Sequence, residues 1–414
     1  MKLYNLFWMV IFACNLNAQM TETISFSFEE GKNRMLKENI RLLAEYYNVD
    51  LAEAEIQQLK LWDNPLFVWN AEMYSVAENK YFAFENQKLL QIEYAFSISG
   101  KRINAVKEAK IGKEIAELAL ADMIRGLVLE YSEVFYEHIE LSQKNEVLLQ
   151  SLQQYDRLIA QYAKGKELGI NSESELIRLK SERQSILSEI NENEKDLLNI
   201  ELALKMLMNV APNSKLKPQR SVGVSIQKKP IEEFYNLALS QRPDIKISIK
   251  SISKSQMNLK KQKAESVPNI NLGYQPHDQG SNHVRPYVGM VFEMGIPVFN
   301  RNQGEIAAAK IQIEQNQLLL KYKQNEVKNE ITAALAALER SEELVNSFNQ
   351  DLMNEMEELS IAAKENYEKR NISLYEYIDF QRSYLQNMLN FIEANRMLNA
   401  AINQFYFTIG SDLK

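Results

Sequence analysis

Residues that interrupt helices are scarce in this sequence. Its 414 residues include only 13 glycines and 9 prolines, so long uninterrupted helices are expected. Cysteine is almost absent, because Cys14 is the one residue of its type and lies in a segment that we expect to be cleaved off or lipidated. The mature chain then has no thiol for a disulfide, a metal ion or nucleophilic chemistry.

An excess of basic residues is also missing. The chain has 48 Lys and Arg against 55 Asp and Glu, a formal net charge of -7 and no basic stripe, so nucleic acid is not an expected partner. We find no nucleophile–base arrangement, no glycine-rich phosphate loop and no zinc-spaced cluster. The sequence therefore predicts neither an enzyme nor a cofactor site.

One group of potential metal ligands lies between two predicted strands, and consists of His277, Asp278 and His283. Imidazole and carboxylate groups do ligate metal ions. A polar, exposed loop is the simpler interpretation, so we expect no metal site there.

The first 18 residues have the features of a secretory signal. Lys2 supplies the positive start, residues 3–13 form a mostly apolar run, and Ala18 offers a small residue at the cleavage point. In a second interpretation, Cys14 is a lipid-attachment site. Both alternatives stay open on the sequence alone, and both predict export.

Long apolar runs are absent after this signal, so no later segment reads as a transmembrane helix. Four segments instead alternate apolar and polar residues with the period of a strand: 67–74, 90–98, 270–275 and 288–296. The first two are close to the roughly 9 to 11 residues that a tilted strand needs to cross a bilayer. If the chain sits in a membrane, it must do so through strands.

The strands are joined to helical segments of two lengths. Shorter helices are predicted over 27–63 and 231–266, and a helix of roughly 90 to 100 Å begins near residue 100 and continues to about 164. A second long helix begins at Glu305. Its apolar residues recur every seven positions, as in a coiled coil; they are Ile306, Ile313, Leu320 and Val327, then Ile331, Leu338, Val345 and Leu352.

The second half of the chain repeats the first. Ser172 and Glu175 form a capping box that opens a return helix, and Ser373 and Glu376 stand 201 positions later with the same spacing. Each copy contains a helix, two strands, a long helix, a tip and a return helix. We divide the chain into a signal (1–18), a first repeat (19–211), a linker (212–230) and a second repeat (231–414).

This order of elements limits what the molecule can be. Four strands cannot close a membrane barrel, and an open sheet edge cannot face lipid, so several chains must share one barrel. The long helices then project away from the membrane as a coiled-coil tube. A barrel continuous with a tube is a conduit.

The whole mature chain resembles the TolC-type outer-membrane efflux proteins in its order of elements. Two segments, Gln91-x-Glu93 with Gly100-Lys101-Arg102 and the run 296–304, are similar to the branch that exports heavy-metal cations. The resemblance implies a mainly α fold with a membrane β-barrel, in which a homotrimer builds twelve strands continuous with an α-helical periplasmic tunnel. It also implies location in outer-membrane lipid, a periplasmic adaptor protein, and an inner-membrane pump of the resistance-nodulation-division type.

The same resemblance assigns residues at the second tip. Glu376 and Asp379 lie one helical turn apart and would ring the periplasmic entrance, and Tyr367 matches a tyrosine of this region. The alternative is a solvated first turn, in which acidic residues suit a helix N-terminus; we favour the entrance. Arg370 and Ile372 depart from the glycine and arginine that are usual in the family.

The two tips are also where the family meets its adaptor, which assigns a docking role to Gly169, Ser172, Glu175 and Ser373. A plain helical turn is the alternative. Drugs or secreted proteins are rival cargoes of the same conduit. A secreted coiled-coil scaffold without a channel is the rival from another class, but it leaves the four alternating segments unexplained.

Overall fold

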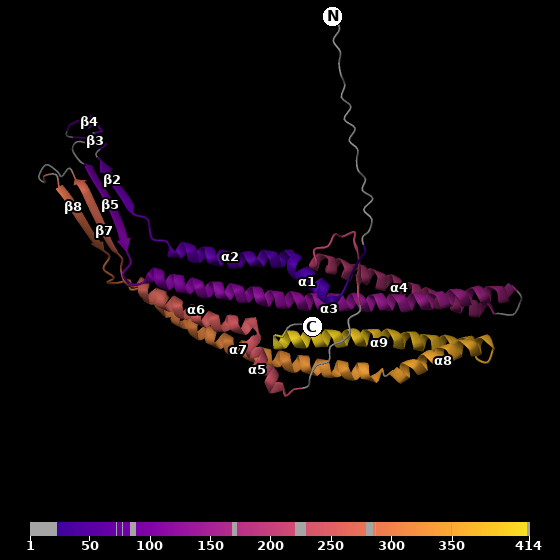
Figure 1. Ribbon diagram of the computed structural model, residues 1–414. Coiled ribbons are helices and arrows are strands. Elements are labelled where there is room, and N and C mark those ends of the chain that lie inside the picture. Colours follow the sequence, from indigo (N-terminus) through magenta and orange to yellow (C-terminus); the bar gives the residue numbers. More distant parts are fainter. Residues whose placement is uncertain are drawn as a thin grey trace, which may run out of the picture.

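The computed structural model describes residues 23–71, 73–76, 78–82, 88–167, 172–219, 229–278, 285, 287–348 and 350–411. The molecule is elongated, with a sheet at one end and two helical hairpin tips at the other (Figure 1). Helix α3 (Lys101–Glu167, 67 residues) runs the whole distance between them. At 1.5 Å per residue its length is about 100 Å, which agrees with the predicted long helix.

The sheet at one end has four strands, namely β2 (Leu66–Ala71), β5 (Lys88–Phe96), β7 (Ile270–Asp278) and β8 (Tyr287–Met294). They pair in this order, and each pair is antiparallel. Four strands were predicted near these positions, and the sheet confirms them.

The first strand is shorter than predicted. It stops at Ala71, and β3 (Tyr74–Ser75) pairs instead with β4 (Lys80–Tyr81) in a separate small hairpin. Two contacts hold this hairpin: the rings of Tyr74 and Tyr81 lie 4.7 Å apart, and the Tyr74 hydroxyl donates to Asn79 Oδ1 at 2.6 Å. Asn79 has a φ of 48°, a left-handed conformation that Asn tolerates.

Four helices continue the four strands. Helix α2 (Ile40–Lys60) leads into β2, and β5 leads into α3. Helix α6 (Pro243–Glu265) leads into β7, and β8 leads into α7 (Gln303–Ser347). These helices contact one another in the order α2, α3, α6, α7, which is the order of the strands they join.

Two helical hairpins form the other half of the molecule. In the first, α4 (Glu173–Leu207) returns along α3, and in the second, α9 (Leu374–Ile409) returns along α8 (Gln350–Glu368) (Figure 1). Both predicted capping boxes are present, with Ser172 and Ser373 as the N-cap residues. Their reciprocal bonds explain why both return helices begin where the sequence predicted.

The predicted helix from Glu305 to the second tip is interrupted. Phe348 has a ψ of 61°, outside the helical range, and separates α7 from α8. Its ring lies 5.8 Å from that of Phe391 on α9. The heptad pattern continues through this position, so packing against α9 overrides the local helical preference.

The shorter helices are each divided in two. Asn39 separates α1 (Phe28–Glu38) from α2; its Oδ1 accepts from Leu42 N at 3.0 Å, and its Nδ2 donates to Leu207 O at 2.9 Å. Arg242 separates α5 (Ile231–Gln241) from α6, where Pro243 takes the first helical position. The break at Asn39 comes from its side-chain cap, and the break at Arg242 comes before the proline that starts α6. A periodic pattern of apolar residues reveals neither.

A small parallel sheet in the middle of the molecule was not predicted. Strand β1 (Thr23–Phe26) pairs with β6 (Lys215–Pro218), which lies inside the interval predicted as linker. Beneath it lies an apolar core with five contacting aromatic rings; these are Phe26, Phe28, Tyr131, Phe135 and Tyr136. Part of the interval 212–230 is therefore an ordered element of this core.

A buried ion network joins four helices in the same region. The Arg242 side chain is 2% exposed; it pairs with Asp244 at 2.7 Å and with Glu330 at 2.6 Å, and donates to Thr408 O at 3.0 Å. Arg125 of α3 lies 3.8 Å from Asp244. The network thus connects α3, α6, α7 and α9.

Candidate functional site

The four-stranded sheet has one predominantly apolar face. The register places the residues of β2, β5, β7 and β8 in alternating rows, and the described side chains in one set of rows are apolar or aromatic, with Lys88 and His277 at the ends of these rows. This apolar face consists of Phe67, Trp69, Leu90, Ile92, Tyr94, Phe96, Ile270, Leu272, Tyr274, Met290, Phe292 and Met294. Several of these side chains are exposed in the single chain: Trp69 is 59% exposed, Phe292 64% and Met290 80%.

The opposite face of the sheet is polar over its centre. Gln91 and Gln275 are buried there, and Gln275 Nε2 donates to Gln91 Oε1 at 2.6 Å. Gln91 Nε2 in turn donates to Glu93 Oε1. Glu293, on β8, shares this face. A sheet that is oily on one side and polar on the other separates an apolar medium from an aqueous one.

The helices give a different result. Within the described segments, none of them combines the length and the apolarity that a membrane-spanning helix requires.

Both edges of the sheet lack a partner strand among the described residues, since β2 and β8 each pair on one side only. The helices that continue these two strands carry exposed apolar stripes. On α2 the stripe includes Ile40 (67% exposed) and Leu51 (67%), and on α7 it includes Leu318 (69%) and Tyr322 (66%). On each side of the molecule, an edge strand without a partner among the described residues is thus joined to a helix with exposed apolar side chains.

Glu376, predicted to ring an entrance, first of all caps its own helix. Its Oε2 accepts from both the N–H and the hydroxyl of Ser373, each at 2.8 Å. These hydrogen bonds, the backbone one foremost, lower the pKa of the Glu376 carboxyl. Glu376 therefore stays ionised while the second carboxylate oxygen is left to face solvent.

Asp379 is exposed on the next turn of α9, on the side of the helix that carries Glu376. The two carboxylates lie at the tip end of the molecule, as the sequence predicted. The entrance role itself remains a prediction.

Tyr367 takes part in a stack of three tyrosines that joins the two hairpins. Its ring lies 4.9 Å from Tyr377 and 6.3 Å from Tyr162 on α3, with interplanar angles of 20° and 9°. Burial raises the pKa of Tyr367, and its hydrogen bond to Tyr162 adds to the effect. Burial also raises the pKa of Tyr377 to about 12. All three hydroxyls are protonated at neutral pH.

A pocket of about 430 Å³ lies beside this stack and is lined by both hairpins. It brings together three of the predicted tip residues, Glu175, Ser373 and Tyr367. Ser172 lies at the neighbouring N-cap, whereas Gly169 is outside the described residues.

Arg370 and Ile372 line the same pocket. Arg370 has a φ of 62°, and Asn371 N donates to Asn366 O at 2.8 Å, which closes helix α8 with a left-handed residue. The resemblance to TolC-type proteins predicted glycine at this position. The residue is an arginine here, and it adopts the left-handed conformation that glycine favours.

One contact between the hairpins was missed from the sequence. Arg382 on α9 binds Glu182 on α4 through two hydrogen bonds, of 2.8 and 2.6 Å, and the Glu182 side chain is 10% exposed. The two residues are 200 positions apart, so no local signal pairs them. The equal spacing of the two capping boxes was the available clue, because it places Glu182 and Arg382 at similar distances from their tips.

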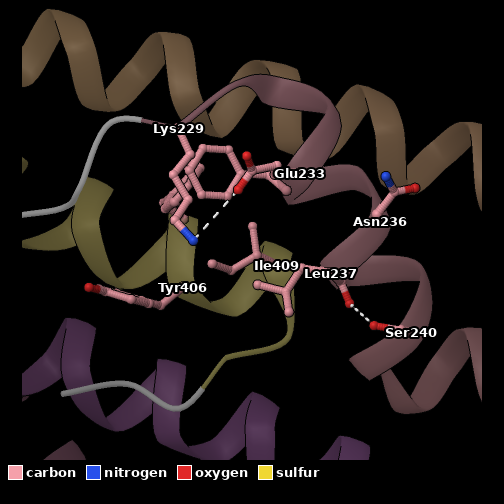
Figure 2. A pocket seen from close by; sticks show the side chains of 9 residues that line it. Lys229, Glu233, Asn236, Leu237, Ser240, Tyr406 and Ile409 are labelled. Carbon is pink, nitrogen blue, oxygen red and sulfur yellow. Dashed lines mark hydrogen bonds and ion pairs between the residues drawn. The ribbon is translucent and has the colours of Figure 1, made fainter.

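A second pocket, of about 550 Å³, lies between α5 and α9 in the middle of the molecule (Figure 2). Its floor is apolar, with Leu237 and Ile409 pointing toward each other, and Lys229 and Glu233 form an ion pair of 3.6 Å at its rim. It lies apart from the predicted tip residues.

The remaining predicted positions lie largely outside the structure. Cys14, His283 and the side chain of His277 fall outside the described residues, so the lipidation alternative and the expectation that this loop holds no metal site both stay predictions. Among the residues that are described, no three His, Cys, Asp or Glu side chains gather closely enough to hold a metal ion.

Comparisons with known proteins agree on the fold. No protein-family model matches the chain. No curated protein matches it either. Solved structures do match: CusC, described for its folding and transmembrane channel formation, has a TM-score of 0.75 and 18% identity and covers 93% of this chain and 92% of its own.

Two further structures are similar over comparable lengths. The CmeC outer membrane channel of Campylobacter jejuni has a TM-score of 0.77 and 15% identity, covering 92% of this chain and 85% of its own. The MtrE outer membrane channel of Neisseria gonorrhoeae has a TM-score of 0.74 and 13% identity, covering 93% of this chain and 89% of its own. The chain therefore shares its fold with these outer-membrane channel proteins.

Proposed function

We propose that this protein is the outer-membrane channel of an efflux system, a passive conduit from the periplasm to the exterior. The observation that carries the proposal is the two-faced sheet at the end of the long helices. Its apolar face suits lipid and its polar face suits an aqueous passage. The similarity of fold to CusC, CmeC and MtrE supports the same conclusion.

The channel is assembled from several copies. The four strands alternate in direction, so β8 of one copy would run antiparallel to β2 of the next, and the alternation continues around a ring. Three copies give twelve strands, and the stripes on α2 and α7 meet in the same ring. Closure leaves no strand edge facing lipid, which is the condition for a sheet in a bilayer.

The hairpin tips form the periplasmic end of this conduit. Three copies would place six carboxylates, from Glu376 and Asp379, around the entrance, where they attract cations. The tips carrying Ser172, Glu175, Gly169 and Ser373 would meet the adaptor protein. That adaptor connects the conduit to an inner-membrane pump of the resistance-nodulation-division type.

Heavy-metal cations are the proposed cargo. Gln91 and Glu93, which belong to the segment similar to the metal-exporting branch, lie on the polar face of the sheet. Drugs and secreted proteins are the alternative cargoes, because a passive passage touches its cargo weakly. Deletion of the gene in the native host should sensitise cells to one of Co, Zn, Cd, Cu or Ag; sensitivity to drugs alone would favour the first alternative.

Electron microscopy of the purified mature protein in detergent tests the channel. We expect elongated particles with three times the 48.0 kDa chain mass less the leader, and a tube about as long as α3. A monomeric rod without a pore would contradict the proposal. The intact mass of the same sample distinguishes cleavage after Ala18 from a diacylated Cys14.

A further inference from the structure

The junction between the sheet and the helices carries a second kind of surface. Every strand meets its helix there, through segments 60–63, 97–104, 260–266 and 295–305. Seven of their apolar side chains are exposed between the sheet and the helices; they are Leu61, Trp62, Ile98, Ile103, Ile296, Val298 and Phe299. We call this set the junction belt.

The same four segments are basic, although the whole chain is acidic. They contain seven basic and three acidic residues, within a chain of net charge -7. The basic residues are Lys60, Lys101, Arg102, Lys260, Lys261, Lys263 and Arg301. Lys101 and Lys261 form ion pairs with Glu265 and Glu108, and Lys60, Lys263 and Arg301 are exposed.

Arg102 is held in place beside the belt. Its guanidinium lies 3.5 Å from the centre of the Trp62 ring, and its Nη1 donates to Lys60 O at 3.1 Å. Trp62 remains 66% exposed despite this contact. A guanidinium that is fixed on one face keeps its other N–H groups oriented for an anion, which lowers the entropy lost on binding a phosphate.

Phe299 is presented by a turn that is fixed in the same way. Gln303 Nε2 donates to Phe299 O at 3.2 Å, and Asn302 Nδ2 donates to Gln262 O on α6 at 2.8 Å. Phe299 is nevertheless 91% exposed. A turn that is tied to its neighbours and still projects a phenyl ring presents that ring to a partner outside the chain.

From these observations we propose that the junction belt is an anchor for the anionic phospholipid surface that borders the sheet. Trp62 and Phe299 lie at headgroup depth, and Arg102, Lys60 and Arg301 contact lipid phosphates. The amphipathic ring of tryptophan and cationic side chains prefer this depth, and phenyl rings insert at the boundary between headgroups and acyl chains. The proposal rests on the proposed function, since it requires the apolar face to lie in the bilayer.

The tryptophans allow the two proposals to be tested separately. Trp69 is on the apolar face and Trp62 in the junction belt, and the seven residue steps from one to the other span up to about 25 Å when extended. This exceeds the roughly 15 Å from the bilayer centre to the edge of the hydrocarbon. In a Trp8→Phe background, Trp69→Phe leaves Trp62 as the reporter and Trp62→Phe leaves Trp69.

The experiment measures tryptophan quenching after reconstitution into vesicles that carry a spin label either on the headgroup or at mid-chain. We expect mid-chain lipid to quench Trp69 most strongly and headgroup lipid to quench Trp62 most strongly. An unquenched Trp69 would overturn the membrane assignment. A quenched Trp69 with Trp62 unquenched, as when a second copy covers the belt, would overturn the anchor alone.

Charge preference is measured with brominated lipids. In vesicles of brominated phosphatidylcholine, added phosphatidylglycerol should relieve the quenching of Trp62 more than that of Trp69, because it displaces the neutral lipid beside Arg102. Arg102→Gln should weaken this preference about fivefold, the effect of one cation near an anionic surface. Lys217→Gln, in the central sheet, is the matched control and should leave it unchanged. Equal preference in Arg102→Gln and the parent would overturn the phosphate contact.

Discussion

The carboxylate of Glu376 has two possible tasks, which substitutions can separate. One oxygen closes the capping box with Ser373, and the carboxyl as a whole carries the charge assigned to the entrance. Glutamine retains the hydrogen bonds of a capping box and loses the charge. Alanine loses both.

We therefore expect Glu376→Gln with Asp379→Asn to reduce cation selectivity in planar bilayers while leaving thermal stability almost unchanged. Glu376→Ala should in addition lower the thermal midpoint, because the hydrogen bonds from Ser373 to the Glu376 side chain are lost. Unchanged selectivity in the double variant would refute the entrance role and leave the helix cap as the function of Glu376.

Arg370 occupies a conformation that costs an arginine free energy. Its φ of 62° is left-handed, and this cost is roughly 1 to 2 kcal/mol for a residue with a Cβ. Arg370→Gly relieves it, although glycine also gains entropy in the unfolded chain. We expect a net stabilisation of about 0.5 to 1 kcal/mol in thermal unfolding followed by circular dichroism. Lys369→Gly, one residue earlier and directly after α8, should instead destabilise the protein, because Lys369 does not have a positive φ.

At the scale of elements, the sheet has an apolar face, which the proposed function assigns to lipid, and a polar face, which it assigns to water; neighbouring residues on β8 report on both. Phe292 lies on the apolar face and Glu293 on the polar face. Phe292→Arg would place a cation against hydrocarbon, at a cost of about 2 to 4 kcal/mol near the bilayer centre.

Phe292→Arg should therefore reduce the amount of assembled protein in outer-membrane fractions. Glu293→Arg introduces the same side chain one residue later and should assemble normally. The measurement is the ratio of heat-resistant oligomer to monomer by immunoblot. Equal assembly of the two variants would contradict the orientation of the sheet.

The elements that could be predicted from the sequence are those with local signals. Alternation gave the strands, heptads gave α3 and α7, and serine–glutamate spacing gave both return helices. Contacts between distant segments had no such signal. β1 and β6 are four residues each and pair across 192 positions, and the break at Phe348 depends on Phe391 of another helix.

The residues of the candidate site also fall into those with a local sequence signal and those without one. Glu376 and Ser373 were found because a capping box is local. Two groups of contacts depend instead on how the two hairpins pack: the stack of Tyr162, Tyr367 and Tyr377, and the pair of Arg382 and Glu182. Of these five residues only Tyr367 was identified from the sequence. It was identified through the family resemblance.

At the scale of the whole molecule, the Arg242 network connects the two repeats. Burial alone would raise the pKa of Asp244, but the hydrogen bonds and charge of Arg242 outweigh it and hold that pKa at about 2. A lowered carboxyl pKa stabilises the fold above the ordinary value near 4. This stability is lost as pH falls from about 4 to about 2.

Arg242→Leu should be destabilising by about 3 kcal/mol, because the buried Asp244 loses its nearest cation and keeps the more distant Lys323 and Arg125, at 3.3 and 3.8 Å. The expected readout is a lower thermal midpoint at pH 7, with a smaller further loss than the parent protein between pH 4 and pH 2.5. Arg41→Leu, which removes an exposed pair with Glu130, is the control and should change stability by less than about 1 kcal/mol. Similar midpoints for the two variants would contradict a structural role for the network.

The two hairpins also differ in how they would carry a mechanical load. A pull applied at the first tip travels to the sheet along α3, a single rod of 67 residues. A pull at the second tip must pass from α8 to α7 across Phe348, where the helix is interrupted. The bending stiffness of a jointed rod is lower than that of a continuous one, so force spectroscopy should find the second tip more compliant. In a ring of three copies, stiff first hairpins and compliant second hairpins would alternate around the axis.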